Sequence, residues 1–252
     1  KGKTLFEAIH FFIFGLLLGS FANVLIWRIP RGESFTWSRS RCTRCSGQIA
    51  WYDNVPVLSY LVLRGRCRGC EEKISLRYPI VELLMAVAFA ALYICVGWKW
   101  VLLEYLIFVF GLIVVSFIDL DHMILPDVFT LPGVVIGLAG AALNPEREFV
   151  PALTGVILGG GLLWLVAYLY YVLRGQEGMG GGDIKLLAWI GAVLGWTAIP
   201  FVILFSSVVG SIVGITVGIR SKKGMAATIP FGPYLALAAI FLIFGGSSVA
   251  EW

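Results

Sequence analysis

Four aspartates in two short stretches of this 252-residue chain could carry acid–base chemistry. The stretch SFIDLDHMILPD contains Asp119, Asp121 and Asp127, and the stretch GMGGGDIK contains Asp183. Two carboxyl groups that share one proton can hydrolyse a peptide bond, because one acts as a base on water while the other protonates the substrate carbonyl. Asp183 together with one acid of the first stretch therefore predicts an aspartic protease site.

A run of glycines directly before Asp183 supports this interpretation. Glycine permits positive φ values and close backbone approach. The run is therefore expected to hold the carboxyl group just inside a helix N-terminus and to give an extended peptide access to it. The residues expected to give this access are Gly180, Gly181 and Gly182.

A purely structural interpretation stays open for Asp121 and Asp127. Pro126 precedes Asp127 as at many helix starts, where the helix dipole favours an acid in the first turn. Other catalysts are scarce, because His10 and His122 are the only histidines and a serine triad or a His-based metal site has little to draw on. His122 is interpreted as a polar residue at the membrane interface.

Two C-x-x-C pairs, CTRC at 42–45 and CRGC at 67–70, are separated by 21 residues. This spacing is typical of a zinc ion bound tetrahedrally by four thiolates. It predicts a structural zinc ribbon whose metal supplies folding energy to a segment too small for a secure core. A redox function for the pairs is the alternative, and the lone Cys95 is interpreted as a small apolar packing residue. The predicted zinc ligands are Cys42, Cys45, Cys67 and Cys70.

The elements that must position these residues are membrane helices. The chain is 59% hydrophobic and 13% charged, with a mean hydropathy of +0.91, whereas soluble domains are about half apolar and about a quarter charged. A spanning helix needs roughly 20 apolar residues. The pattern predicts an all-α polytopic membrane protein of about eight transmembrane helices, with a small cytoplasmic four-cysteine zinc-ribbon-like insertion after the first. The predicted helices cover residues 5–27, 79–97, 100–118, 127–143, 150–173, 184–196, 198–219 and 230–248.

Lysine and arginine are unevenly divided between the two sides of this arrangement. One side carries 15 of the 19 basic residues, and the other carries only Lys1, Lys3, Lys99 and Arg147. Because cytoplasmic loops collect basic residues, the cysteine pairs and both acidic stretches are expected on the cytoplasmic side. The net charge of +4 is then a topology signal and does not favour nucleic-acid binding. The predicted domains are a first transmembrane helix at 1–27, a cytoplasmic zinc-binding domain at 28–78 and a membrane aspartic protease core at 79–252.

Six motifs follow one another along almost the whole chain. They are GSFANVLIWRIP at 19–30, the two cysteine pairs around IAWYDNVPVLSYLVLRGRC, ISLRYPIVELL at 74–84, IDLDHMILPD at 118–127, GMGGGDIK at 178–185 and IPFGPYLALAAI at 229–240. In this order they resemble the bacterial type IV prepilin leader peptidases, the membrane aspartic proteases of type IV pili and type II secretion.

The resemblance implies which two acids are catalytic. In that family one aspartate lies seven residues before the proline of a D-x6-P motif, and the other ends a G-x-G-D motif. Here these positions are Asp119, seven before Pro126, and Asp183. The resemblance therefore selects Asp119 over Asp121. One departure is Thr43, which stands where the first cysteine pair usually has a proline and which affects the stiffness of the turn without changing the metal ligands.

An activity is also implied by the resemblance. The family removes the basic leader of prepilins and pseudopilins at the cytoplasmic face of the bacterial inner membrane, and many members then N-methylate the new terminus with S-adenosylmethionine. Structural Zn²⁺ and S-adenosylmethionine are therefore the expected cofactors. Prepilins or pseudopilins, the lipid bilayer and the pilus or type II secretion machinery are the expected partners. No Rossmann-like glycine fingerprint is present, so the methyl donor needs a fold-specific site, for which Gly65 is a candidate and a simple turn glycine the alternative.

Two other classes of function are weighed against this one. A membrane assembly factor could dock partners through its zinc ribbon and use the aspartates as caps, but it leaves the pairing of GMGGGD with D-x6-P unexplained. A transporter could bind ions with carboxylates near broken helices. However, no matching interruption occurs in an earlier helix, and the acids lie toward one face instead of the membrane midplane.

Overall fold

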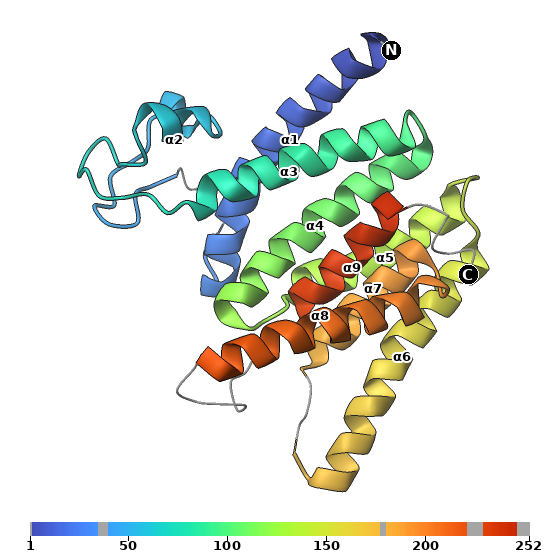
Figure 1. Ribbon diagram of the computed structural model, residues 1–252. Helices are drawn as coiled ribbons and strands as arrows, with labels where there is room; N and C mark the ends of the chain where they lie inside the picture. Colours follow the sequence, from blue (N-terminus) through green and yellow to red (C-terminus); the bar gives the residue numbers. More distant parts are fainter. Residues whose placement is uncertain (1, 35–39, 177–179, 221–228, 246–252) are drawn as a thin grey trace. The chain divides into compact units, whose positions relative to one another are not determined.

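The computed structural model describes residues 2–34, 40–176, 180–220 and 229–245 (Figure 1). This described part is helical apart from its loops, two short 3-10 helices and two isolated β-bridges. The chain divides into two compact units, Lys1–Trp98 and Lys99–Trp252. Gly178 of the GMGGGDIK stretch and the basic residues Lys222 and Lys223 lie outside the described residues.

Eight helices of 14 or more residues in the described part of the chain lie close to the eight that the sequence predicts, and they confirm the all-α membrane architecture. The first unit contains α1 (Gly2–Arg28), η1 (Ile29–Arg31), η2 (Trp51–Asn54), α2 (Leu58–Val62) and α3 (Arg77–Val96). The second unit contains α4 (Trp100–His122), α5 (Asp127–Leu143), α6 (Phe149–Arg174), α7 (Gly181–Leu194), α8 (Ala198–Arg220) and α9 (Gly232–Gly245).

Five helices of the described chain, α1, α3, α4, α6 and α8, are long and apolar enough to cross a membrane. The others are shorter than the roughly 20 residues of a full crossing, because α5 has 17 residues and α7 and α9 have 14 each. The sequence predicts a short helix at the place of α7. The chain is therefore a membrane protein, and the count of complete crossings stays a prediction.

In the first unit, α1 and α3 pack antiparallel at close range. A Cβ atom added at Gly15 would lie 2.6 Å from Ala86 Cα, and one added at Gly19 would lie 2.6 Å from Glu82 Cα. The two glycines face α3 one turn apart, so the helix backbones approach along a strip that larger residues would hold apart. The segment between α1 and α3 consequently starts and ends at the same end of this helix pair.

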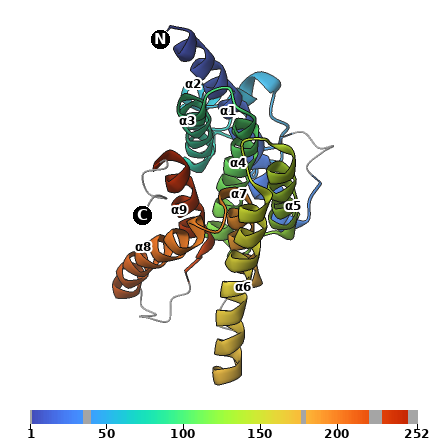
Figure 2. The same cartoon turned by 90° about the vertical axis from the view of Figure 1, so that its right-hand side faces the viewer.

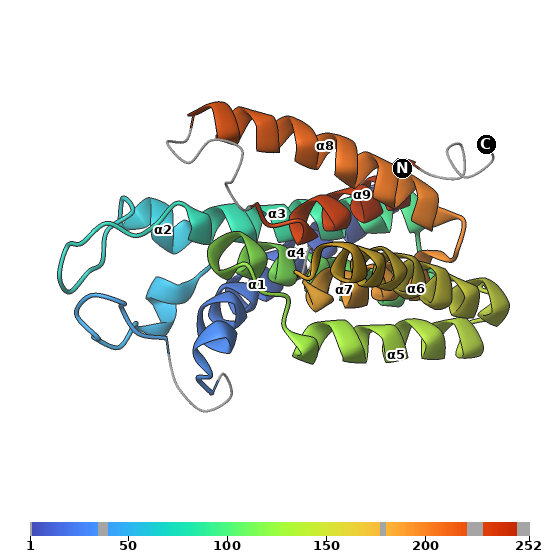
Figure 3. The ribbon, with the colours of Figure 1, turned by 90° about the horizontal axis from the view of Figure 1, so that it is seen from below.

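In the second unit, α7 is the central helix. Its side chains from Leu186 to Val193 are mostly buried, and Figure 3 shows α7 between α9 on one side and α5 on the other. The indole of Trp189 packs directly on two glycines, because a Cβ at Gly111 of α4 or at Gly133 of α5 would lie 2.3 Å from a ring carbon. The position of α7 is therefore fixed by the close packing of Trp189 on α4 and α5.

A buried ion pair ties together the end of the second unit that lies away from the aspartate stretches. Arg147 donates to the Glu104 carboxylate, to the Gly137 carbonyl at 3.2 Å and to the Ala192 carbonyl at 2.7 Å. Glu104 is 8% exposed. A buried charge is tolerated when it is paired and hydrogen-bonded. Arg147, which the sequence presents as a loop charge, therefore joins α4, α5 and α7.

The outer helices of the second unit present apolar surface to their surroundings. Within the most apolar 18-residue stretch of each helix, 22% of α6 and 17% of α8 is buried inside the protein, against 61% of α4. Figure 2 shows α6 running past the end of α7, so that part of it has no helix beside it. Apolar surface of this extent suits contact with lipid, which matches the predicted bilayer environment.

Candidate active site and metal centre

Asp119 lies in the last turn of α4 and is 5% exposed. Its Oδ2 atom accepts a hydrogen bond of 3.0 Å from the backbone N–H of Gly232, the first residue of α9. A helix N-terminus has free N–H groups and favours negative charge. The buried carboxylate is thus held by the start of a helix that is 113 residues further along the chain.

Leu125 joins this helix start to a third element. The helix α4 ends at His122, and the next residue, Met123, has a left-handed conformation with φ of 54°. The chain then runs over Ile124 to Pro126 into α5. A Cβ at Gly182 would lie 2.7 Å from Leu125 Cβ, and one at Gly232 would lie 3.0 Å from Leu125 Cδ2. Leu125 therefore packs against the start of α7 and the start of α9 at once.

Asp183 lies in the first turn of α7, next to Gly182 and half-buried. Its N–H donates to the carbonyl of Gly180 at 3.2 Å. The carboxyl groups of Asp183 and Asp119 interact electrostatically. The structure consequently brings together the two acids, which are 64 residues apart in sequence, at the meeting point of α4, α7 and α9.

The glycines before Asp183 differ from the expectation in one respect. Gly180 has a φ of −71° and Gly181 begins the helix, and none of the three has a positive φ. These glycines instead provide space. A Cβ at Gly180 or Gly181 would meet no atom of the described residues within 4 Å, whereas Gly182 is closed by Leu125.

The other two candidate acids, Asp121 and Asp127, lie at the surface of the second unit. Asp121 is exposed near the end of α4, as is His122. Asp127 lies in the first turn of α5, as the sequence predicts. Its carboxylate accepts two hydrogen bonds from Lys185 Nζ at 2.7 and 2.8 Å. This ion pair links the two aspartate stretches on the surface, close to Asp183.

The four cysteines of the two pairs form one cluster in the first unit. Their Sγ atoms all lie within 4.8 Å of one another, and Cys42 and Cys70 are separated by 3.8 Å between sulfurs. Four thiolates around zinc at about 2.3 Å place neighbouring sulfurs about 3.8 Å apart. The cluster therefore fits a tetrahedral metal ion. Cys95 lies apart from it, exposed on α3, so it does not fill the core of this unit as expected.

The two cysteine pairs have the same backbone geometry. The N–H of Cys42 donates to the Gly47 carbonyl, and the N–H of Cys67 donates to the Glu72 carbonyl, at 2.9 Å in both cases. A non-glycine residue with positive φ follows four positions after each first cysteine, Ser46 at 56° and Glu71 at 57°. The first turn forms although Thr43 replaces the usual proline.

The thiols of the cluster differ in acidity. Backbone hydrogen bonds from Cys45 and Arg44 lower the pKa of Cys42 to about 7. A backbone hydrogen bond from Glu72 also lowers the pKa of Cys70, but desolvation and the neighbouring thiols outweigh it and raise this pKa to about 12. Metal binding at neutral pH must therefore displace protons, since the ligands of zinc are thiolates.

Gly65 has the properties of a turn glycine. Its φ is +68°, and a Cβ at this position would lie 2.7 Å from the hydroxyl oxygen of Tyr60. The left-handed conformation and the close ring both favour glycine. Its predicted contact with a methyl donor stays a prediction.

The helices and the paired acids define a polytopic membrane protein with an aspartate site in one unit and a cysteine cluster in the other. Residues 106–215 match the Type IV leader peptidase family, and residues 13–96 match the Bacterial Peptidase A24 N-terminal domain. The two matches fall on the two compact units. The chain belongs to the type IV leader peptidase family.

Several relatives share the name prepilin leader peptidase/N-methyltransferase. The protein of Aeromonas hydrophila is 39% identical over 96% of this chain and 91% of its own length. The protein of Pseudomonas aeruginosa is 36% identical over 95% and 90%, and that of Myxococcus xanthus is 44% identical over 82% of this chain and 62% of its own length. No solved structure matches the chain.

Sequence reasoning missed two residues of the site, Leu125 and Gly232. Both lie within motifs that were used for the resemblance, IDLDHMILPD and IPFGPYLALAAI. The P-F-G-P pattern at 230–233 is a signal of a helix start, but nothing in it indicates that the start faces Asp119.

Proposed function

We propose that this protein removes the leader peptide of type IV prepilins or pseudopilins, with Asp119 and Asp183 as the catalytic pair. One observation carries the proposal: Leu125 packs against both Gly182 and Gly232 and so draws the ends of α4, α7 and α9 together around the two carboxyl groups. The names of the relatives supply the substrate class.

Hydrolysis by this pair needs one carboxylate and one carboxylic acid. The carboxylate takes a proton from water, whose oxygen bonds to the scissile carbonyl carbon while the carboxylic acid protonates the carbonyl oxygen. The C–N bond then breaks, the leaving amine receives the proton held by the first aspartate, and a hydroxyl proton of the intermediate returns to the second. One water is consumed, and both aspartates regain their starting states.

The surroundings of the pair suit a substrate that is itself a membrane helix. Asp119 and Asp183 lie at helix ends, where a bilayer helix gives way to the headgroup region. Open space beside Gly180 and Gly181 leaves room for an extended segment. We place this end of the helices at the cytoplasmic face of the bacterial inner membrane, because the loops expected there are rich in lysine and arginine. We propose the pilus or type II secretion machinery as the source of the partners.

Methylation of the new N-terminal amine is the second part of the proposed function. When bound, S-adenosylmethionine would supply a methyl group to this amine, which loses one proton while the sulfonium is left as the thioether of S-adenosylhomocysteine. The cysteine cluster would hold a structural zinc ion, and the bound ion would fix the fold of the segment between α1 and α3. The ligands would be Cys42, Cys45, Cys67 and Cys70.

Mass spectrometry of a purified prepilin tests both activities. We expect the wild-type protein in detergent or nanodiscs to convert the prepilin into two fragments whose summed mass exceeds the substrate by one water. With S-adenosylmethionine added, the mature fragment should gain one methyl group at its N-terminus. A prepilin that stays intact would contradict the peptidase assignment, and a cleaved product that never gains the methyl group would reduce the function to hydrolysis.

A further inference from the structure

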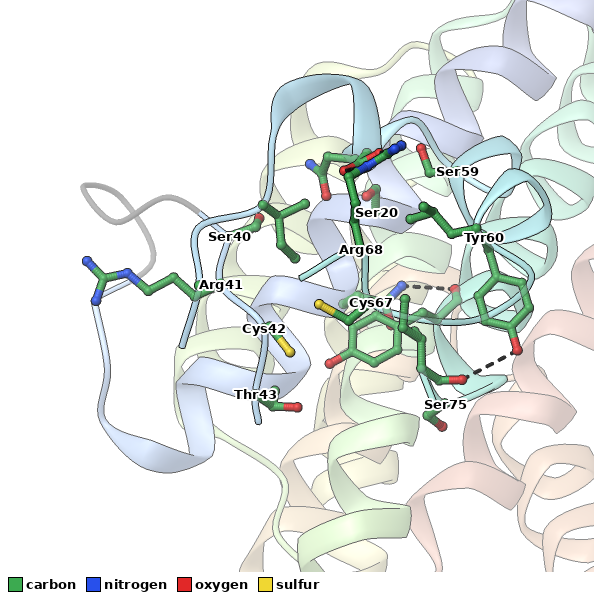
Figure 4. A pocket seen from close by; sticks show the side chains of 18 of the residues that line it. Ser20, Ser40, Arg41, Cys42, Thr43, Ser59, Tyr60, Cys67, Arg68 and Ser75 are labelled. Carbon is green, nitrogen blue, oxygen red and sulfur yellow. Dashed lines mark hydrogen bonds and ion pairs between the residues drawn. The ribbon is translucent and has the colours of Figure 1, made fainter. Parts of the chain in front are cut away.

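The first unit contains a large cavity that the peptidase chemistry does not use. Its volume is about 1070 Å³, slightly above the roughly 300–1,000 Å³ of small-molecule sites. The walls come from α1, both cysteine pairs, α2 and the beginning of α3. Figure 4 shows the cavity from close by, with Ser20 of α1, Tyr60 of α2 and Cys67 among the side chains that line it.

Three polar side chains from α1 and α3 that line this cavity, Ser20, Asn23 and Glu82, are called its polar corner here. They meet because Gly19 brings α1 against the backbone of α3 at Glu82. Glu82 is 8% exposed and Asn23 is 3% exposed. A buried carboxylate beside a buried amide is costly unless both are hydrogen-bonded.

The hydrogen bonds of this corner are incomplete. Asn23 Nδ2 donates to the carbonyls of Tyr78 at 3.0 Å and Gly19 at 3.2 Å, but its Oδ1 atom is buried and has no partner among the described residues. Glu82 accepts from the N–H of Val57 at 2.7 Å and interacts with Ser20. A carboxylate offers about four acceptor positions, so acceptors remain and what the corner lacks is a donor.

We propose that this cavity binds S-adenosylmethionine, with its amino-acid ammonium group donating to Glu82 and to Asn23 Oδ1. This inference rests on the methyltransferase part of the proposed function. The ammonium carries three N–H donors and a positive charge, which match a carboxylate and an unpartnered carbonyl. Trp27 and Tyr78 line the same cavity, and aromatic rings of this kind can stack with an adenine ring. One face of Trp27 is covered by the Arg31 guanidinium, 3.6 Å from the ring centroid, so Tyr78 is the better placed of the two.

A second hollow, in the other unit, lacks this chemistry. It lies between α6 and α8, has a volume of about 450 Å³ and is lined by apolar side chains except for Ser207 and the indole N–H of Trp196. None of its described lining residues has a carboxylate, an amine, a guanidinium or an imidazole. A zwitterionic nucleoside with a sulfonium group would lose its hydration there without compensation.

Equilibrium dialysis with labelled S-adenosylmethionine tests the site in the zinc-loaded full chain in nanodiscs. Glu82→Gln keeps the shape of the side chain and removes its charge. Because hydrogen bonds to charged groups are the strong ones, we expect the affinity to fall at least about tenfold. The matched control is Glu33→Gln, an exposed acid at the same cavity, for which we expect a change below about twofold. Equal affinities of wild type and Glu82→Gln would overturn the proposal.

Photo-crosslinking of the wild-type chain gives an answer that does not depend on how a variant folds. Ultraviolet irradiation with labelled S-adenosylmethionine should label peptides from 20–28 or 77–82, and label confined to 99–252 would overturn the site. If Glu82→Gln weakens only the binding of a cleaved-pilin peptide, Glu82 belongs to the acceptor amine and the proposal is wrong. Wild-type protein that methylates pilin while Glu82→Gln keeps its affinity would remove this site and leave the proposed function standing.

Discussion

The cysteine cluster and the aspartate cluster are assembled in different ways. The four cysteines come from one segment of the first unit, and each pair is shaped by hydrogen bonds to residues at most five positions away. Asp119 and Asp183 instead depend on residues from three separate helices and one linker, up to Gly232. The first cluster is therefore expected to depend on a metal ion, whereas the second depends on the packing of the second unit.

Removal of the metal by a chelator should produce the largest difference in stability between the two clusters. A structural zinc ion supplies on the order of 10 kcal/mol to a small module, so its removal should increase amide exchange at Cys42 and Cys67 at least about a hundredfold. Amides of α7 should keep their protection, because the packing around Trp189 contains no metal ligand. Hydrogen–deuterium exchange of the full chain with and without chelator measures both.

Unchanged amide exchange rates at Cys42 and Cys67, after the metal has been shown to leave, would contradict this prediction. In that case the turns would be stable without a metal ion. Exchange that rises equally in α7 would mean that the two units unfold as one.

A single methyl group should disturb the aspartate cluster. In Gly182→Ala the new Cβ would lie 2.7 Å from Leu125 Cβ, and overpacking of this kind costs about 1–3 kcal/mol. We expect kcat/KM for leader removal to fall at least about tenfold, because Leu125 must move away from Gly182 and Gly232. The metal content should stay that of the wild type.

The matched control for this variant is Gly161→Ala on α6, where an added Cβ meets no described atom within 4 Å. Its kcat/KM should stay within about twofold of wild type, since exposed substitutions usually have small effects. Equal rates for both alanine variants would show that the packing of Leu125 does not position the acids.

The smallest effect is expected at the ion pair between Arg68 and Asp53 of the cysteine module, whose side chains are 57% and 10% exposed. Arg68 donates to Asp53 at 2.7 and 2.8 Å, and this hydrogen bond lowers the pKa of Asp53 below its ordinary 3.8. A lowered pKa means that the contribution of the carboxylate is complete above its ordinary value and is lost only as the pH falls through the lowered one. Asp53→Asn should therefore weaken zinc binding by no more than about threefold.

This small difference should be the same at about pH 6 and about pH 8, because Asp53 is ionised at both. Competition with a colorimetric zinc chelator measures it. A difference between Asp53→Asn and wild type that changes across this range would show that another group titrates with the pair.

Much of the fold follows from the sequence because each helix has a local cause. Apolar stretches of the right length predict the helices, and the two C-x-x-C pairs predict their own cluster. Asp127 in the first turn of α5 is likewise predicted by the preceding proline. These features depend on neighbours in the sequence, and the structure confirms them.

The rest depends on contacts between distant residues. Residue spacing leaves the partner of Asp183 open between Asp119 and Asp121, and only the family resemblance selects Asp119. In the structure the distinction is burial, because Asp119 is buried against Gly232 while Asp121 is exposed. No local pattern reveals which face of α4 is covered by α9. Arg147 is a similar case. Its charge correctly suggests a loop, between α5 and α6, but the sequence does not show that its hydrogen-bond partners come from three different helices.

The rate of leader removal by Asp183→Asn, measured beside Asp119→Asn and the double variant on a purified prepilin, tests the central claim most directly. Each single variant should lower kcat/KM at least about a thousandfold, and the double variant should be little worse, because the two acids act as one unit. Asp121→Asn should remain within about threefold of wild type. A folded Asp183→Asn or Asp119→Asn protein that cleaves the prepilin at the wild-type rate would contradict the account.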